Sequence, residues 1–177
     1  MNFVDSASNP IIAIDFDDTI NINGQCKYPQ CGDVRPWAKE VINFMNKLGI
    51  KIVIWTSRDV AFNQDEKKLY DHVSPMIEWL DSNGIHYDAV NKSIQFAPYH
   101  YNGRKVYAHM YVDDRSFGWC DVEDGKDDEI FLNVLRSFLI KVCGFDTRLA
   151  DSAVSKCIDG VNPTPYMIRE VELWKRR

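Results

Sequence analysis

Runs of consecutive apolar residues alternate with segments of helical apolar spacing along the first two thirds of the chain. The apolar runs at 11–15 and 50–55 are each followed by polar residues, and two weaker runs lie at 85–90 and 105–112. A continuous apolar run is typical of a strand buried on both faces, so we predict four strands at these positions.

Helices are predicted between the first three strands. Segments 36–48 and 64–82 carry apolar residues at helical spacing, and Gly49 and Gly84 are suited to end them. The polar residues at 21–35 predict a loop or flap after the first strand. The order strand, helix, strand, helix, strand, loop, strand predicts an α/β fold with a mostly parallel sheet.

The C-terminal part of the chain contains only helical patterns. A dense apolar stripe at 130–142 predicts one helix, and Asp146 and Thr164 are suited to cap two more. We therefore predict an α/β core over residues 1–123 and a helical extension over 124–177. Packing of the extension on the core is left open by the pattern.

Composition excludes several classes of protein. The chain has 177 residues, is 45% hydrophobic and carries a net charge of −5, which argues against a broad nucleic-acid-binding surface. No apolar run approaches the roughly 20 residues of a membrane helix, and the start lacks the pattern of a signal peptide. We therefore expect a cytoplasmic protein whose five cysteines are free thiols.

Carboxylates gather where two of the predicted strands end. Asp15 and Asp17 follow the first strand, Asp113 and Asp114 follow the last, and Thr56 follows the second. The carboxyl ends of parallel strands meet at one edge of a sheet, where ligands bind. Carboxylates at close quarters need a cation, and hard oxygen ligands suit Mg²⁺ together with a phosphate group. One carboxylate can then attack phosphorus while a second acts as general acid.

The same segments resemble the motifs of a known superfamily. The stretch DFDDT at 15–19 resembles motif I of the haloacid dehalogenase (HAD) superfamily, IVIWTSR at 52–58 resembles motif II, and YVDDR at 111–115 resembles motif IV. The match spans roughly residues 10–118. It implies a HAD-like Rossmannoid three-layer fold and a Mg²⁺-dependent phosphohydrolase acting through an aspartyl phosphate.

The resemblance also implies a role for each matched residue. Asp15 is implied as the nucleophile, and Asp17 as the general acid and base whose backbone carbonyl binds Mg²⁺. Thr56 is implied to hydrogen-bond the phosphoryl group. The acidic pair Asp113 and Asp114 is implied to position Mg²⁺, so that the expected metal residues are Asp15, Asp17, Asp113 and Asp114.

The lysine of motif III has no clear match. Lys92 follows the third predicted strand, so we assign it the catalytic cation, with Arg58 as a second candidate and Arg115 behind both. Asp18 falls on the variable position of motif I, and we interpret it as a turn or surface residue outside the active site. Substrate contacts are expected from Thr19, Ser57 and Arg58.

The intervals between the motifs are too short for an inserted cap domain. This resembles the capless members of the superfamily, whose open sites accept bulky phosphates such as a nucleotide or a nucleic-acid end. Aromatic residues in the loop at 96–105 are a candidate contact for such a leaving group. Two alternatives stay open: a phosphotransferase of the same superfamily, and a non-enzymatic binding module built on the same core.

Overall fold

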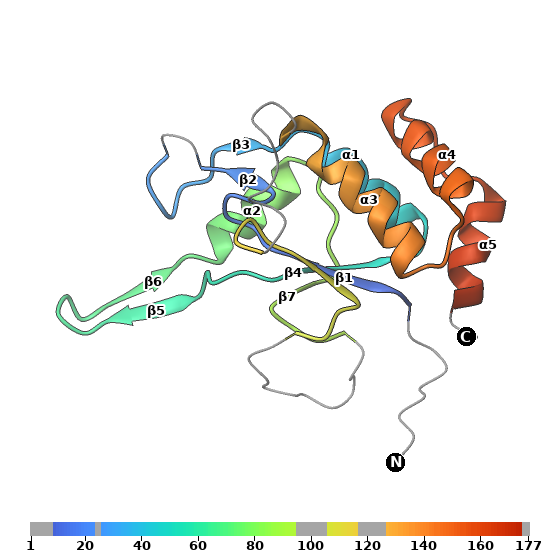
Figure 1. Cartoon of the computed structure of the whole chain (residues 1–177). Coiled ribbons are helices and arrows are strands. Elements are labelled where there is room, and N and C mark those ends of the chain that lie inside the picture. The colour runs from blue at the N-terminus through green and yellow to red at the C-terminus, as the bar shows by residue number, and fades with distance from the viewer. Residues whose placement is uncertain (1–8, 24–25, 95–105, 117–126, 175–177) are drawn as a thin grey trace, which may run out of the picture.

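The computed structural model describes residues 9–23, 26–94, 106–116 and 127–174. Strands alternate with helices in the first part, and helices alone make up the last part (Figure 1). The elements in chain order are β1 (Ile11–Ile14), β2 (Asn21–Ile22), β3 (Asp33–Val34), α1 (Ala38–Lys47), β4 (Lys51–Ile54), β5 (Val60–Asn63), β6 (Lys68–Asp71), α2 (Ser74–Ser82), β7 (Ala89–Val90), β8 (Met110–Val112), the short 3₁₀ helix η1 (Asp127–Glu129), α3 (Ile130–Lys141), α4 (Thr147–Ile158) and α5 (Pro165–Trp174).

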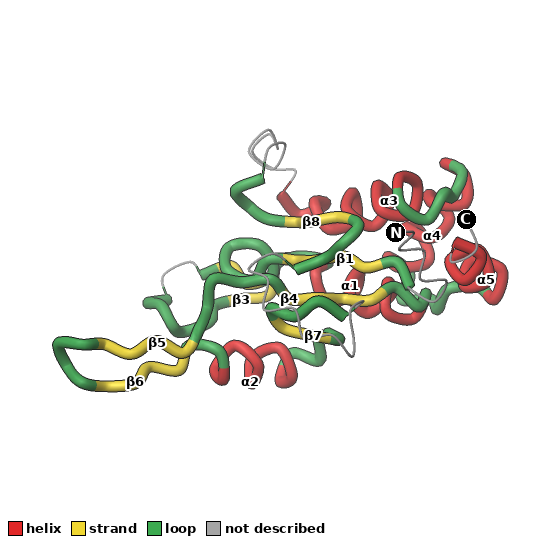
Figure 2. Tube along the Cα trace, turned by 90° about the horizontal axis from the view of Figure 1, so that it is seen from below, coloured by secondary structure: helices red, strands yellow, loops and turns green. Residues whose placement is uncertain are grey.

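The central sheet has four strands in the order β7-β4-β1-β8, all parallel to their neighbours. Figure 2 shows them side by side. The chain steps outward from β1 to β4 and β7, then returns to place β8 on the other side of β1. The order therefore reverses between β1 and β8, which is where open α/β sheets bind ligands. The predicted mixed α/β fold with a parallel sheet is confirmed, and it is consistent with a Rossmann-like architecture.

The two faces of the sheet are covered differently. Ile12, Ile14 and Ile54 belong to a large hydrophobic cluster to which all five α-helices contribute. Thus α3, α4 and α5 share one core with α1 and the sheet. On the other face, Ile11 packs in a smaller cluster with Val106.

No helix from the described ranges contributes to this smaller cluster, which differs from the three-layer arrangement that the HAD resemblance implies. Because β8 lies on the other side of β1 from β4 and β7, a right-handed connection from β7 to β8 is expected on the face opposite α1 and α2. Ile94 and Val106, from the described parts of that connection, pack on this face.

A β-hairpin corrects the helix predicted at 64–82. Residues Val60–Asn63 and Lys68–Asp71 pair antiparallel, and only Ser74–Ser82 is helical. The Asn63 side chain accepts hydrogen bonds from the backbone N–H groups of Asp65 and Glu66, which favours a turn over a continued helix. The Asp71 carboxylate then accepts from the N–H of Ser74, the first residue of α2.

Other boundaries are closer to expectation. The helix predicted at 36–48 is confirmed as α1, and the strand predicted at 50–55 is confirmed as β4. The two weaker strands exist but are shorter than predicted, since β7 holds two residues and β8 three. The flap at 21–35 contains the antiparallel pair β2–β3. The loop at 96–105 and the boundary at 123 lie outside the described residues.

Candidate functional site

The polar residues after the central strands meet at one edge of the sheet. They surround a cavity of about 290 Å³. Its lining consists of Asp15, Asp17, Asp18, Trp55, Thr56, Ser57, Asp113, Asp114 and Arg115. Most of the residues that the sequence placed at this edge are therefore brought together.

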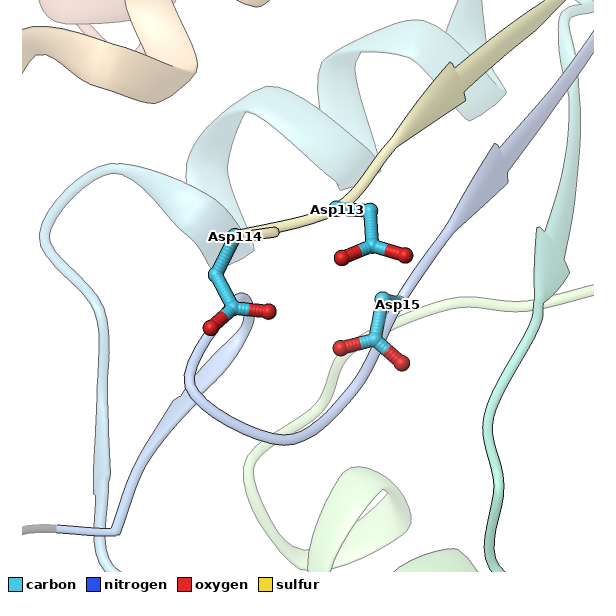
Figure 3. Close-up of side chains that lie close together, drawn as sticks. All are labelled: Asp15, Asp113 and Asp114. Atoms are coloured by element: carbon cyan, nitrogen blue, oxygen red, sulfur yellow. The ribbon is translucent and has the colours of Figure 1, made fainter. Parts of the chain in front are cut away.

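Three carboxylates converge at the point where the strand order reverses. Oxygen atoms of Asp15, Asp113 and Asp114 lie within 4.8 Å of one another. Figure 3 shows them at the ends of β1 and β8, pointing into the same space. Burial, followed by repulsion from Asp113 and Asp114, raises the pKa of Asp15 to about 7, against hydrogen bonds from Phe16 and Thr19 that lower it. Burial and repulsion from Asp113 likewise raise the pKa of Asp114.

The donor set of this cluster fits a hard divalent cation. Carboxylate oxygens are ligands that Mg²⁺ prefers, and the adjoining cavity leaves room for water or a phosphate. A cation would also offset the repulsion that raises the pKa of Asp15. Asp15, Asp113 and Asp114 are thus the residues able to hold a metal through their side chains, whereas the Asp17 side chain is engaged elsewhere.

Thr19 links the two acidic segments through its hydroxyl. Its hydroxyl donates to Oδ2 of Asp15 at 3.2 Å and accepts from the backbone N–H of Asp114 at 3.0 Å. The residue is fully buried and does not line the cavity. The structure therefore places Thr19 as a residue that positions two carboxylates, and not at the substrate-facing position expected from the sequence.

The Asp17 side chain forms a two-pronged ion pair with Arg58. Arg58 Nε and Nη2 donate to the two carboxylate oxygens at 2.9 and 2.7 Å, and Nη1 donates to the carbonyl of Pro29 at 2.7 Å. Burial alone would lower the pKa of Arg58, but the bonds to Asp17 outweigh it and raise that pKa. Rings of Phe16 and Tyr28 lie 4.8 and 5.1 Å from the guanidinium.

Arg58 is consequently a buried partner of Asp17. The sequence predicted it as a substrate contact or second cation, but its side chain has no exposed area and does not line the cavity. A buried charge is stable only when it is paired, and the Asp17 carboxylate supplies the pair.

Thr56 and Ser57 stand at the cavity as predicted. The Thr56 hydroxyl accepts a hydrogen bond from the N–H of Arg58 at 3.1 Å, which leaves its own proton free to be donated. Ser57 is exposed and lines the cavity. Both residues are thus suited to contact a phosphoryl oxygen.

Asn91 fixes the segment that carries Thr56, a role that the sequence did not reveal. Its side chain accepts from the Thr56 N–H and donates to the Thr56 carbonyl, both at 2.9 Å. Asn91 adopts a left-handed φ of 49°, which asparagine tolerates better than most residues. The side chain extends the ladder between β4 and β7 past the end of β7.

Two residues differ from their predicted places relative to the cavity: Lys92, expected to be the catalytic cation, lies outside it, and Asp18, expected outside, lines it. Lys92 is exposed and does not line the cavity, while Arg115 does. Asp18 is an exposed turn residue with φ 57°, as interpreted from the sequence, yet it lines the cavity. Its position is fixed by Arg35, whose Nη2 donates to the Asp18 carbonyl at 2.6 Å.

The metal-free protein is expected to lose stability as pH rises from about 4 to 7. The folded Asp15 has its pKa raised to about 7 from 3.8, so over this range the folded state binds a proton that the unfolded state has lost. The loss should be on the order of 2 kcal/mol for this partly exposed group. Urea unfolding in a chelator at several pH values measures it.

Mg²⁺ should restore that stability at pH 8, where the three carboxylates are most strongly charged, and should have little effect at pH 4.5. A metal-free stability that is flat or rising between pH 4 and 7 would contradict the electrostatic argument.

An Asn91→Ala change is expected to destabilise the end of β4. It removes two hydrogen bonds to the Thr56 backbone, and we expect a loss of about 1 to 2 kcal/mol in unfolding free energy. Hydrogen exchange of the Thr56 amide should accelerate more than exchange in α4. Asn43→Ala is a matched control, because that side chain also bonds backbone groups, of Gly84 and His86, away from the cavity. Equal exchange effects in both variants would count against a local role.

Comparison with known proteins gives the fold but no activity. No family model matches the chain, and no curated protein matches it. One solved structure, that of a conserved protein from Bacteroides thetaiotaomicron, is similar with a TM-score of 0.51 and 25% sequence identity. The similarity covers 72% of this chain and 93% of that protein. Among the described helices, none has the length and apolar character needed to cross a bilayer.

Proposed function

We propose that this protein is a Mg²⁺-dependent phosphomonoesterase of the HAD type that acts through an aspartyl-phosphate intermediate. The observation that carries the proposal is the convergence of oxygen atoms of Asp15, Asp113 and Asp114 within 4.8 Å, in a cavity that Thr56 also lines. Motifs far apart in sequence thus supply one cavity with a nucleophile, a cation-binding set and a phosphoryl-binding hydroxyl.

The first step is attack on phosphorus by Asp15. A carboxylate oxygen forms the new bond to phosphorus, the ester P–O bond breaks, and the leaving oxygen takes a proton. Thr19 orients the attacking carboxylate, since its hydroxyl donates to Oδ2 of Asp15. Thr56 and Ser57 bind phosphoryl oxygens. Arg115 lines the same cavity, and we assign to it the cationic contribution first expected from Lys92.

The second step returns the free enzyme. Asp17 removes a proton from a water molecule, the water oxygen bonds to phosphorus, and the bond to Asp15 breaks. Arg58 donates to both carboxylate oxygens of Asp17 and so holds the side chain of this base in place. In the first step Asp17 must instead donate a proton. The ion pair with Arg58 therefore has to loosen when substrate binds.

Magnesium would be held by the side chains of Asp15, Asp113 and Asp114, and when bound it neutralises charge on the phosphoryl oxygens. The expected contribution from Asp17 is its backbone carbonyl, which is compatible with a side chain engaged by Arg58.

The deciding experiment is a phosphate-release screen with the full chain. Nucleotides, sugar phosphates and 3′-phosphorylated oligonucleotides are incubated with Mg²⁺ or with excess chelator. We expect release from at least one substrate class, lost on chelation. Release from no substrate would overturn the proposal. Adding an acceptor alcohol distinguishes a phosphotransferase, which would pass phosphate to the alcohol in preference to water.

A further inference from the structure

The register of the sheet sets three side chains side by side at the cavity. On the central strand, Ile14 pairs with Ile54 of β4 and Val112 of β8. The next residue on each strand therefore stands at the same level, and residues at one level of a parallel sheet project from the same face. Asp15 follows Ile14, and its two neighbours at this level come from the ends of β4 and β8.

Those neighbours are Trp55 on one side of Asp15 and Asp113 on the other. The Trp55 N–H donates to the carbonyl of Ile14 at 2.9 Å, which ties its backbone to the residue before the nucleophile. Adjacent strands lie about 4.8 Å apart, so Trp55 is an immediate neighbour of Asp15. The structure thus gives the nucleophile an acidic, cation-binding side and an aromatic side.

The Trp55 ring is held in place and still reaches the cavity. It is half-buried and packs edge-on against Tyr111, with 5.3 Å between ring centroids. Trp55 lines the cavity, where it is the aromatic member among the described lining residues. A rigid aromatic surface offers stacking energy at a small entropic cost.

Trp55 differs in chemistry from the other residues that line the cavity. The lining otherwise consists of five aspartates, two hydroxyl residues and Arg115. The phosphate and cation account for these polar groups, but they give no reason for an indole beside the nucleophile. We propose that Trp55 stacks on a flat ring in the leaving group, so that the enzyme prefers nucleoside or aryl-bearing monophosphates over saturated ones. This inference rests on the proposed function and names its substrate class.

The test uses pairs of esters that share the type of leaving oxygen and differ in the ring. Uridine 5′-monophosphate is compared with methyl ribofuranoside 5-phosphate, and benzyl phosphate with cyclohexylmethyl phosphate. Full-length wild-type protein, Trp55→Leu and Trp55→Phe are assayed with Mg²⁺. The readout is the ratio of kcat/KM within each pair, because a variant that folds poorly lowers both rates together.

In the wild type we expect the flat-ring ester to be preferred by about 10- to 100-fold in at least one pair, as base stacking on aromatic side chains allows. Trp55→Leu should bring that ratio to within about 3-fold of unity, and Trp55→Phe should keep most of it. Hydrolysis without preference in either pair, or a preference unchanged in Trp55→Leu, would overturn the inference while leaving the proposed function intact.

Release of phosphate from none of the four esters would point to failure of the proposed function. Stacking is then judged by calorimetric binding of the same pairs to wild type and Trp55→Leu with Mg²⁺. Equal affinities within both pairs for wild type would overturn the stacking inference as well.

Discussion

The Asp15→Asn variant is expected to release phosphate about 1000-fold more slowly than the wild type, or slower still. The substitution keeps the size of the side chain but replaces the attacking carboxylate by an amide, which is a far weaker nucleophile. The measurement is single-turnover phosphate release with Mg²⁺ and the best substrate of the screen. Asp65→Asn serves as the matched control, since Asp65 lies exposed in the turn between β5 and β6, away from the cavity.

The Asp15→Asn substitution should not lower the thermal stability of the metal-free protein, although it lowers activity. In chelator at pH 8, Asp15→Asn should melt at a higher temperature than the wild type, because the amide removes a charge that burial and Asp113 disfavour. At pH 5 the folded wild type already carries a proton on Asp15, so the difference should shrink. Loss of activity with unchanged or higher stability separates a chemical role from misfolding. Retained phosphate release would exclude Asp15 as the nucleophile.

An Arg58→Met variant is expected to cost about 3 kcal/mol of unfolding free energy and to slow phosphate release about 100-fold. The guanidinium is fully buried, and its removal leaves the carboxylate of Asp17 without its partner. Asp17 would then lose the orientation that general acid and base catalysis needs. Arg58→Lys should recover little, since an ammonium cannot form the two-pronged contact.

A double-mutant cycle with Asp17→Asn tests the pair directly. If the ion pair stabilises the fold, Arg58→Met should cost at least about 1 kcal/mol less when Asp17 is already asparagine. The control is the exposed pair Arg136–Asp151, for which Arg136→Met should cost less than about 1 kcal/mol despite a 2.6 Å contact. A coupling energy near zero for Arg58 and Asp17 would contradict a stabilising ion pair between them.

Local pattern accounted for the four strands of the central sheet and for the acids that follow them. The apolar runs at 11–15 and 50–55 predicted β1 and β4, and the polar residues after them predicted the edge at which the cavity lies. This succeeds because burial on both faces leaves a continuous apolar run, and because parallel strands direct their carboxyl ends to one edge.

The hairpin at 60–71 shows where local pattern fails. Within the helix predicted at 64–82, Met76 and Leu80 are buried in α2, but Leu69 lies in β6 and is 62% exposed, so its spacing from them carried no information about a buried helical face. Apolar periodicity predicts a helix only if the apolar residues are the buried ones. The turn residue Asn63, and Asp71 ahead of α2, were the available signals, and both act through hydrogen bonds within a few residues.

The sequence by itself determined which acids end the strands, and it predicted that Asp15 and Asp17 meet Asp113 and Asp114. In the structure Asp15 meets Asp113 and Asp114, whereas the Asp17 side chain pairs with Arg58. Only the tertiary structure decided what each neighbour does. Arg58 pairs with Asp17 across 41 positions of sequence, and Thr19 reaches the Asp114 backbone across 95. Pairing of β4 with β7 puts Asn91 beside Thr56, and pairing of β1 with β4 puts Trp55 beside Asp15. Such contacts depend on strand order and register, which join distant segments and leave no periodic trace along the chain.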